Sequence, residues 1–208
     1  MSARLLTNPS RQSSLPRFAR NLRLRLSCAV IAMLGCSAPA LADGDHYIGG
    51  GMGAFQLSNG INKDTVFGAF MLLGHQFSEH FSAEIRLGGT GSSGDGDALA
   101  PRPKQRMDFV AHYIKPHWNF NRNISAYGLL GFAVVHGSYQ AVGGAKQSKN
   151  RISYAYGAGI NYRWSADFSV DAEFTHMLSK PKNDPATINT SYKGLEANSF
   201  TAALKYYF

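Results

Sequence analysis

The stretch Asn198–Phe208, NSFTAALKYYF, decides the fold of this 208-residue sequence. Read backwards from the last residue, every second side chain is bulky or apolar: Phe208, Tyr206, Leu204, Ala202 and Phe200. The residues between them are mostly more polar and include Lys205, Thr201 and Ser199. Because successive side chains of a strand point to opposite faces, this period of two predicts a β-strand with one apolar face.

Seven earlier segments consist of aromatic and β-branched runs between breaks rich in Gly, Asn, Ser and Pro. They cover residues 46–57, 65–77, 81–89, 106–120, 124–139, 151–164 and 168–178. Segment 151–164 alternates most regularly and carries aromatic residues toward both ends, as expected where rings lie at two membrane interfaces. We therefore predict an all-β fold, an eight-stranded antiparallel up-and-down transmembrane β-barrel.

The lipid face of segment 106–120 is left open by its sequence. One candidate face holds Met107, Phe109, Ala111 and Tyr113, and the other holds Val110, Ile114, Trp118 and Phe120. Proline cannot donate to a ladder, so a bulge near Pro116 could switch the phase between these two faces.

The run Gly49-Gly50-Gly51, followed by Gly53, is unusual for a strand. We interpret it as close packing around a bulky side chain of the lumen. A phosphate-cradling loop is the alternative, but neither the Lys-Ser/Thr pair nor the helix that such a loop needs follows in the sequence.

Short and long connections alternate along the chain. Three are tight, at 78–80, 121–123 and 165–167, and four are longer, at 58–64, 90–105, 140–150 and 179–197. Bacterial barrels have short periplasmic turns and longer extracellular loops. A soluble eight-stranded barrel is the alternative, but it would need neither apolar outward faces nor a terminal aromatic residue.

Residues 1–42 have the parts of a secretory signal: basic residues up to Arg25, a short apolar run at 26–34, and Ala40-Leu41-Ala42 before the expected cleavage point. A lipoprotein site at Cys36 is a weaker alternative. Cys28 and Cys36 both precede residue 43, so we expect a barrel domain at 43–208 without thiol chemistry. Its 15 basic and 13 acidic residues give a net charge of +2, which argues against a nucleic-acid partner.

The sequence resembles the small eight-stranded outer-membrane barrels of the opacity-protein and outer-membrane-protein-A type. The resemblance rests on HYIGGGMG at 46–53, on GHQF at 74–77 with Glu84 following, and on the end of the chain at 202–208. It implies the bacterial outer membrane as location, with its lipid and lipopolysaccharide as partners, and a monomer. It also implies that the barrel-assembly machinery recognises the last strand through Phe200, Leu204, Tyr206 and Phe208.

Six charged residues are predicted to point into the lumen: Glu84, Arg86, Arg163, Asp171, Glu173 and Lys205. An eight-stranded barrel is just wide enough for its own side chains, and an unpaired buried charge is costly. We therefore predict a salt-bridged plug that fills the lumen. A narrow ion path is the alternative.

We predict no enzymatic activity and no cofactor. We also predict no metal site, because the seven histidines are scattered over different segments, and His112 and His117 would point to opposite faces of an unbroken strand. The best catalytic candidates are His176, Ser179 and Glu173, which resemble the Ser, His and Glu of lipid A deacylase barrels. Their spacing differs from that family, whose His and Ser lie two residues apart. In a regular strand Glu173 and His176 would point to opposite faces, although a bulge could bring them together.

The outer loops are the remaining functional surface. Their basic residues are Arg102, Lys104, Lys146, Lys149, Lys180, Lys182 and Lys193. Solvated loops without a ligand are one interpretation. The other is attraction to lipopolysaccharide phosphates or to a host glycan or matrix ligand, as in opacity-type adhesins. We predict a structural or adhesive barrel, with a rim-active lipid A hydrolase or a narrow ion channel as alternatives.

Overall fold

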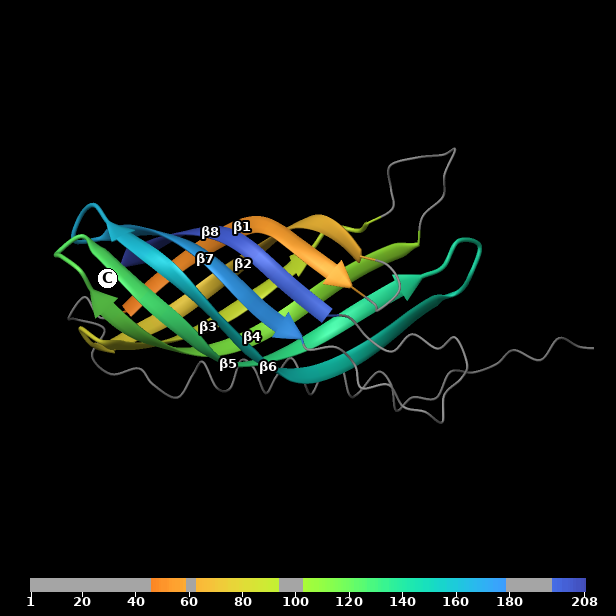
Figure 1. Ribbon diagram of the computed structural model, residues 1–208, viewed down its shortest axis with the longest axis horizontal. Coiled ribbons are helices and arrows are strands. Elements are labelled where there is room, and N and C mark those ends of the chain that lie inside the picture. The colour runs from red at the N-terminus through yellow and green to blue at the C-terminus, as the bar shows by residue number, and fades with distance from the viewer. Residues whose placement is uncertain (1–45, 59–62, 94–102, 179–195) are drawn as a thin grey trace, which may run out of the picture. The chain divides into compact units, whose positions relative to one another are not determined.

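A computed structural model describes residues 46–58, 63–93, 103–178 and 196–208 of the chain. Eight strands run through these residues: β1 (His46–Ser58), β2 (Lys63–Ser78), β3 (Phe81–Thr90), β4 (Lys104–Asn119), β5 (Ile124–Gln140), β6 (Lys146–Arg163), β7 (Phe168–Leu178) and β8 (Glu196–Tyr207). Each strand pairs antiparallel with the next, and β8 pairs with β1, so the sheet closes (Figure 1). The predicted fold class is confirmed. The predicted signal at 1–42 lies outside the described residues.

Side chains alternate between the lumen and the outer surface along every strand. On β3, Glu84 and Arg86 are buried whereas Ile85 and Leu87 are exposed. Every strand exposes large apolar side chains at outward positions, among them Met52, Phe67, Leu87, Ile114, Leu130, Ile160, Phe174 and Phe200. An apolar belt of this extent is unfavourable in water and is the surface that a barrel presents to lipid. In the described part of the chain, no helix is long and apolar enough to cross a membrane.

Strand β4 keeps one phase throughout. Met107, Phe109, Ala111 and Tyr113 are buried in the lumen, whereas Ile114 and Trp118 are exposed outside. The register with β5 is the same on both sides of Pro116, since Ile114 pairs with Leu130 and His117 with Tyr127. The phase switch considered at Pro116 is therefore wrong. No residue is inserted there, so the inward and outward parity continues unchanged.

The glycine run of β1 makes room for lumen side chains, as the sequence predicted. A Cβ atom on Gly51 would lie 2.8 Å from a ring carbon of Phe70 and 2.9 Å from Cβ of Ala203. A Cβ atom on Gly53 would lie 2.7 Å from Cα of Thr201. Real side chains do not approach this closely, so only glycine lets the neighbouring rings and backbone occupy this part of the lumen.

Three tight turns lie at one end of the barrel, which we call the turn end (Figure 1). Side-chain oxygens stabilise them: Asn121 Oδ1 accepts hydrogen bonds from the backbone N–H groups of Asn123 and Ile124, at 2.9 and 2.8 Å. Ser165 Oγ accepts one from the N–H of Phe168 at 3.1 Å. Asn and Ser at these positions favour turns for this reason.

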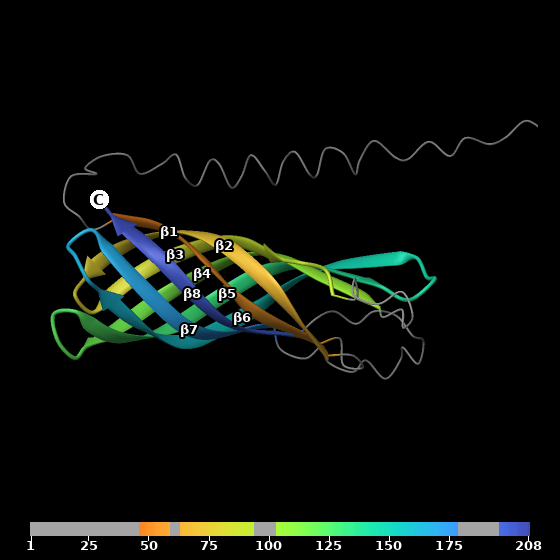
Figure 2. The ribbon, with the colours of Figure 1, turned by 90° about the horizontal axis from the view of Figure 1, so that it is seen from above.

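The longest hairpin, β5–β6, lies at the opposite end, which we call the ribbon end, and extends beyond the other strands (Figure 2). Its turn comprises only residues 141–145 and contains Gly143, whose φ of 69° is readily adopted by glycine. The predicted loop at 140–150 is therefore too long. Lys146 and Lys149 belong to strand β6, where they pair with Gln140 and Gly137. The other three connections at this end fall largely outside the described residues.

Candidate functional site

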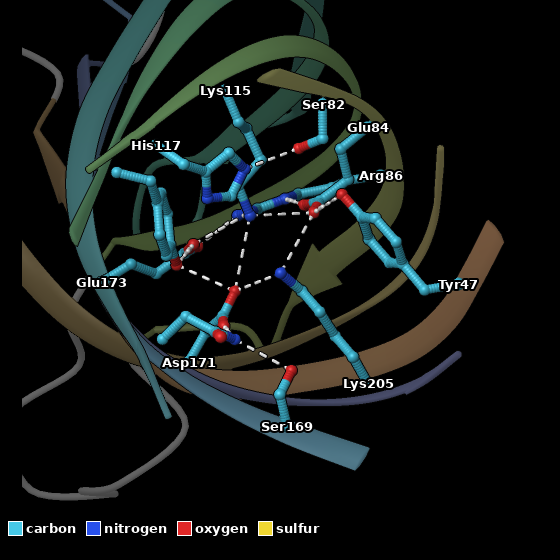
Figure 3. A network of polar contacts seen from close by, with 12 residues as sticks. Tyr47, Ser82, Glu84, Arg86, Lys115, His117, Ser169, Asp171, Glu173 and Lys205 are labelled. Atoms are coloured by element: carbon cyan, nitrogen blue, oxygen red, sulfur yellow. Dashed lines mark hydrogen bonds and ion pairs between the residues drawn. The ribbon is translucent and has the colours of Figure 1, made fainter. Parts of the chain in front are cut away.

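Six ionisable side chains meet inside the barrel: Glu84, Arg86, Lys115, Asp171, Glu173 and Lys205 (Figure 3). We call them the ionic cluster. They come from inward positions on β3, β4, β7 and β8, and none is more than 3% exposed. Three are acidic and three are basic, so the cluster is neutral as a whole. Neutrality matters because an uncompensated buried charge is unfavourable by several kcal/mol.

Arg86 joins two of the carboxylates. Its Nη1 and Nη2 atoms both donate to Glu173, with Nη2 lying 2.9 Å from Oε2, while Nε donates to Oε1 of Glu84 at 2.5 Å. The planar guanidinium suits such two-pronged recognition of a carboxylate. The Cζ atom of Arg86 lies 4.8 Å from the ring centre of Phe70 and 5.0 Å from that of Tyr113. Such cation–π contacts favour the observed position of the guanidinium.

Lys115 and Lys205 lie between the same two carboxylates. Lys115 Nζ is 3.0 Å from Glu84 Oε2 and 3.4 Å from Asp171 Oδ2. Lys205 Nζ is 2.5 Å from Asp171 Oδ2 and 3.6 Å from Glu84 Oε2. Each ammonium is thus shared, and the pair of carboxylates balances the two positive charges. Lys115 Nζ also lies 3.9 Å from the ring centre of Tyr127.

Neutral donors complete the hydrogen bonding of the carboxylates. The Tyr47 hydroxyl donates to Glu84 Oε2 at 3.0 Å, and that of Tyr127 lies 2.9 Å from oxygens of both Asp171 and Glu173. Asn161 donates to Asp171 Oδ1 at 2.6 Å, and Thr201 adds a second donor, 3.2 Å from Glu173 Oε1, beside Nη1 of Arg86. Every carboxylate oxygen of the cluster therefore has a donor, as a buried ionic network requires.

The structure brings together five of the six charges that the sequence places in the lumen. The exception is Arg163, a correction to the expected cluster. It lies at the turn end of β6, partly exposed, with its guanidinium 3.9 Å from the ring centre of Tyr207. The third base is Lys115, which sequence reasoning missed because the phase of β4 was open. Once Tyr113 is placed in the lumen, the alternation of a strand places Lys115 there too.

An apolar layer fills the lumen between the ionic cluster and the ribbon end. Its members are Phe55, Leu57, Met107, Phe109, Val135 and Met177, all buried. The rings of Phe55 and Phe109 have their centres 6.0 Å apart. The lumen of the described barrel is thus occupied by side chains, as its eight-stranded circumference predicts.

The structure does not bring the catalytic candidates together. Glu173 is held inside by Arg86, whereas His176 lies on the outer surface, where its Nδ1 is 2.6 Å from Oδ1 of Asn198. The bulge of this hairpin falls between His176 and Leu178, so it leaves the opposite facing of Glu173 and His176 unchanged. Ser179 lies outside the described residues. Within the described ranges, no group of three or more His, Cys, Asp and Glu side chains could hold a metal ion.

Basic side chains gather on the ends of three neighbouring strands, which we call the basic ribbon: Lys104–Asp108 of β4, His136–Gln140 of β5 and Lys146–Arg151 of β6. The register places Lys104, Gln140 and Lys146 in one row, and Arg106, Ser138 and Ser148 in a row two residues further along the strands. The ribbon contains five basic residues and one acidic residue, Asp108, which is paired with Arg106 at 3.0 Å. Predicted contacts Arg102, Lys180, Lys182 and Lys193 lie outside the described residues.

An eight-stranded closed barrel with an apolar outer belt and a filled, charge-balanced lumen defines a small outer-membrane barrel protein. Residues 28–208 match the model of the family described as outer membrane protein beta-barrel domain, and the chain belongs to this family. Its place is therefore the bacterial outer membrane.

The chain is also similar to individual proteins of this kind of fold. The attachment invasion locus protein of Yersinia pseudotuberculosis is 31% identical over 61 residues, 29% of this chain and 34% of that protein, so the match spans about a third of the relative. The crystal structure of attachment invasion locus protein Ail of Yersinia pestis is similar with a TM-score of 0.56 at 18% identity, covering 80% of this chain and all of that one. The crystal structure of Neisserial surface protein A is similar with a TM-score of 0.60 at 11% identity, covering 78% of this chain and 97% of that one. At these identities the two structures show a shared fold.

Proposed function

We propose that this protein is a non-enzymatic surface barrel that binds anionic glycans through its basic ribbon. The observation that carries the proposal is the concentration of positive charge on the part of the barrel that extends farthest from the belt (Figure 2). The described ribbon has a net charge of +4, whereas the barrel domain as a whole is nearly neutral. Sulfate and phosphate groups are attracted to such a surface.

The geometry of the ribbon suits a carbohydrate ligand. Lys146, Lys149 and Arg106 are exposed. Gln140 lies in the same row as Lys146, and Ser148 lies in the same row as Arg106, so neutral hydrogen-bonding side chains accompany these two basic residues. Paired strands hold these groups more rigidly than a loop would, which reduces the entropy lost on binding. The Yersinia pestis Ail barrel, which shares this fold, has been crystallised in complex with the heparin analogue sucrose octasulfate.

The proposal includes the route to the membrane. A signal at residues 1–42 would be cleaved after Ala42, and the assembly machinery would recognise the last strand. Support for the second point is that Phe200, Leu204 and Tyr206 lie on the outer face of β8, with Phe208 directly after it, and that these four side chains are between 39% and 65% exposed. The proposed state is a monomer, since one barrel closes its own sheet without free strand edges in the membrane belt.

Two features support a binding role over the catalytic and channel alternatives. Glu173 is held in the lumen by Arg86, whereas His176 lies on the outer face, so the alternative lipid hydrolase would lack the acidic member of its candidate triad. Among the described residues, the ionic cluster and the apolar layer together occupy the lumen, and the apolar layer interrupts a polar path from one end to the other.

Surface plasmon resonance with immobilised heparin and the folded barrel in detergent micelles tests the proposal. We expect saturable binding that weakens with rising ionic strength, because salt screens exposed charges beyond a Debye length of about 10 Å at 0.1 M. The double variant Lys146→Gln/Lys149→Gln should bind about tenfold more weakly, at about 0.7 kcal/mol for each exposed contact.

The matched control compares two single variants. Arg122→Gln removes an exposed positive charge at the turn end, and Lys146→Gln removes one from the ribbon. Binding that is lost equally in both would show a general charge effect and would contradict the ribbon as the site. A parallel measurement with lipopolysaccharide vesicles separates a host-type glycan from the phosphates of the bacterium's own lipid.

A further inference from the structure

Two histidines that are 29 positions apart in the sequence face each other at the turn end of the barrel. His46 begins β1 and pairs directly with His75 of β2, and both side chains lie on the outer face. Their ring centres are 4.4 Å apart, with 35° between the planes. This pair belongs neither to the ionic cluster nor to the basic ribbon.

The backbone shows why the two imidazoles lie so close. The carbonyl of His46 accepts a hydrogen bond from the N–H of Phe208, so the polar backbone groups of His46 point toward β8. A strand residue directs its N–H and C=O to one side, and His46 and His75 therefore form a non-hydrogen-bonded pair of the β1–β2 ladder. Side chains approach most closely at such pairs, where the Cα atoms are about 4.5 Å apart.

Packing alone leaves part of this pair unexplained. Nδ1 of His75 is buried and has no hydrogen-bond partner among the described residues. The ring of Phe77 meets His75 edge-on at 4.6 Å, and that of Phe208 lies 6.2 Å from His46. These aromatic rings cover part of each imidazole but supply no partner for a ring nitrogen. A buried nitrogen without a partner is unfavourable unless a ligand satisfies it.

From this geometry we propose that His46 and His75 together bind a divalent late-transition-metal ion, with copper(II) preferred. Two imidazoles that bind one ion through nitrogens at about 2.0 Å, at a right angle, have ring centres roughly 4.5 Å apart. The observed separation matches this value, and rotation about the Cβ–Cγ bonds, which is soft for histidine, can turn the nitrogens toward a shared ion.

The choice of metal follows from the ligands. Imidazole nitrogens suit copper, nickel and zinc, and copper(II) binds most tightly of the divalent series at a given nitrogen site. Water would complete the coordination, because the two histidines supply only two positions. Sequence spacing did not reveal the pair, since the barrel register and not the local sequence brings residues 46 and 75 together.

Titration of the folded barrel in detergent micelles with copper(II) alone, followed by electron paramagnetic resonance and calorimetry, tests this inference. We expect one saturable equivalent with superhyperfine coupling from two imidazole nitrogens. His46→Phe and His75→Phe each keep an aromatic ring but remove one metal ligand. Each should weaken copper binding at least about tenfold, because losing a residue that only hydrogen-bonds to a metal ligand already has an effect of this size.

His112→Phe is the matched control, because His112 is also outward and stacks on Phe132 at 4.9 Å, but has no histidine opposite it. Its copper affinity should equal that of the wild type. On a gel, the folded barrel runs as a band that disappears on heating. Copper(II) should raise the temperature at which this band disappears for the wild type but not for the double variant His46→Phe/His75→Phe. No saturable binding, or equal binding by the wild type and this double variant, would overturn the inference and leave aromatic packing as the role of the pair.

Discussion

Arg86 is the residue on which the ionic cluster depends most. It is the partner that links Glu84 to Glu173, and its guanidinium carbon lies within 5.0 Å of the ring centres of Phe70 and Tyr113. A buried salt bridge adds little stability compared with a well-packed apolar replacement of the whole network. Removing one partner is a different matter, because the charges that remain are then buried without compensation.

Arg86→Met should therefore destabilise the folded barrel by about 3–5 kcal/mol. Urea-induced unfolding in lipid vesicles, followed by tryptophan fluorescence, measures the change in the free energy of unfolding. The control is Arg106→Met, since the Arg106–Asp108 pair has side chains 55% and 46% exposed and should contribute less than about 1 kcal/mol. Equal effects of the two substitutions would show that the lumen is hydrated and the cluster screened.

The residues of this cluster also show what a sequence can and cannot reveal. Alternation alone placed Glu84, Arg86, Asp171, Glu173 and Lys205 at inward positions, because their strands have one clearly apolar face. It failed for Lys115 because both faces of β4 carry bulky apolar residues. It failed for Arg163 because parity gives the direction of a side chain and not its height in the barrel, and this arginine lies beside the terminal turn.

At the scale of single elements, β1 shows how one strand serves two surfaces. Gly51 faces the lumen, where the ring of Phe70 occupies the space that a side chain would need. Gly50 faces outward, and a Cβ atom added there would lie 3.6 Å from the backbone oxygen of Phe70, an ordinary contact. The two glycines are neighbours with the same backbone requirements. Their substitutions should nevertheless differ, because overpacking is felt only on the inner face.

Gly51→Val should destabilise the barrel by about 1–3 kcal/mol, the usual cost of overpacking. Part of this loss would come from the displaced ring of Phe70, which lies against Arg86. Gly50→Val should have little effect or a slightly favourable one, since valine prefers strands and would face lipid. Unfolding midpoints of the two variants in the same vesicles provide the comparison, and a larger effect at position 50 would show that the assigned faces are reversed.

Strand ends were harder to predict than strand existence. Residues 146–150 are polar and were assigned to a loop, yet they pair fully with β5. A polar strand beyond the membrane belt has no apolar face, so its periodicity gives no signal. The pairing of individual residues on neighbouring strands is equally hidden from the sequence, as His46 and His75 show, because it depends on the register of whole strands.

At the scale of the whole molecule, the tight turns and the basic ribbon lie at opposite ends of one closed barrel. In outer-membrane barrels the short turns face the periplasm, so the ribbon should face the cell exterior. The only cysteines of the chain, Cys28 and Cys36, lie in the expected signal. Single cysteines introduced at the two ends can therefore report the orientation without further changes to the chain.

Ala145→Cys at the tip of the β5–β6 hairpin and Ala166→Cys in the turn before β7 form a matched pair, since both alanines are exposed in short connections. A membrane-impermeant maleimide should label Ala145→Cys in intact cells and should label Ala166→Cys only after the outer membrane is permeabilised. The reverse pattern would place the ribbon in the periplasm, where it could not meet an external glycan. Labelling of both sites in intact cells would mean that the barrel does not separate two compartments. The orientation test thus bears on the ribbon's proposed role independently of any measured affinity.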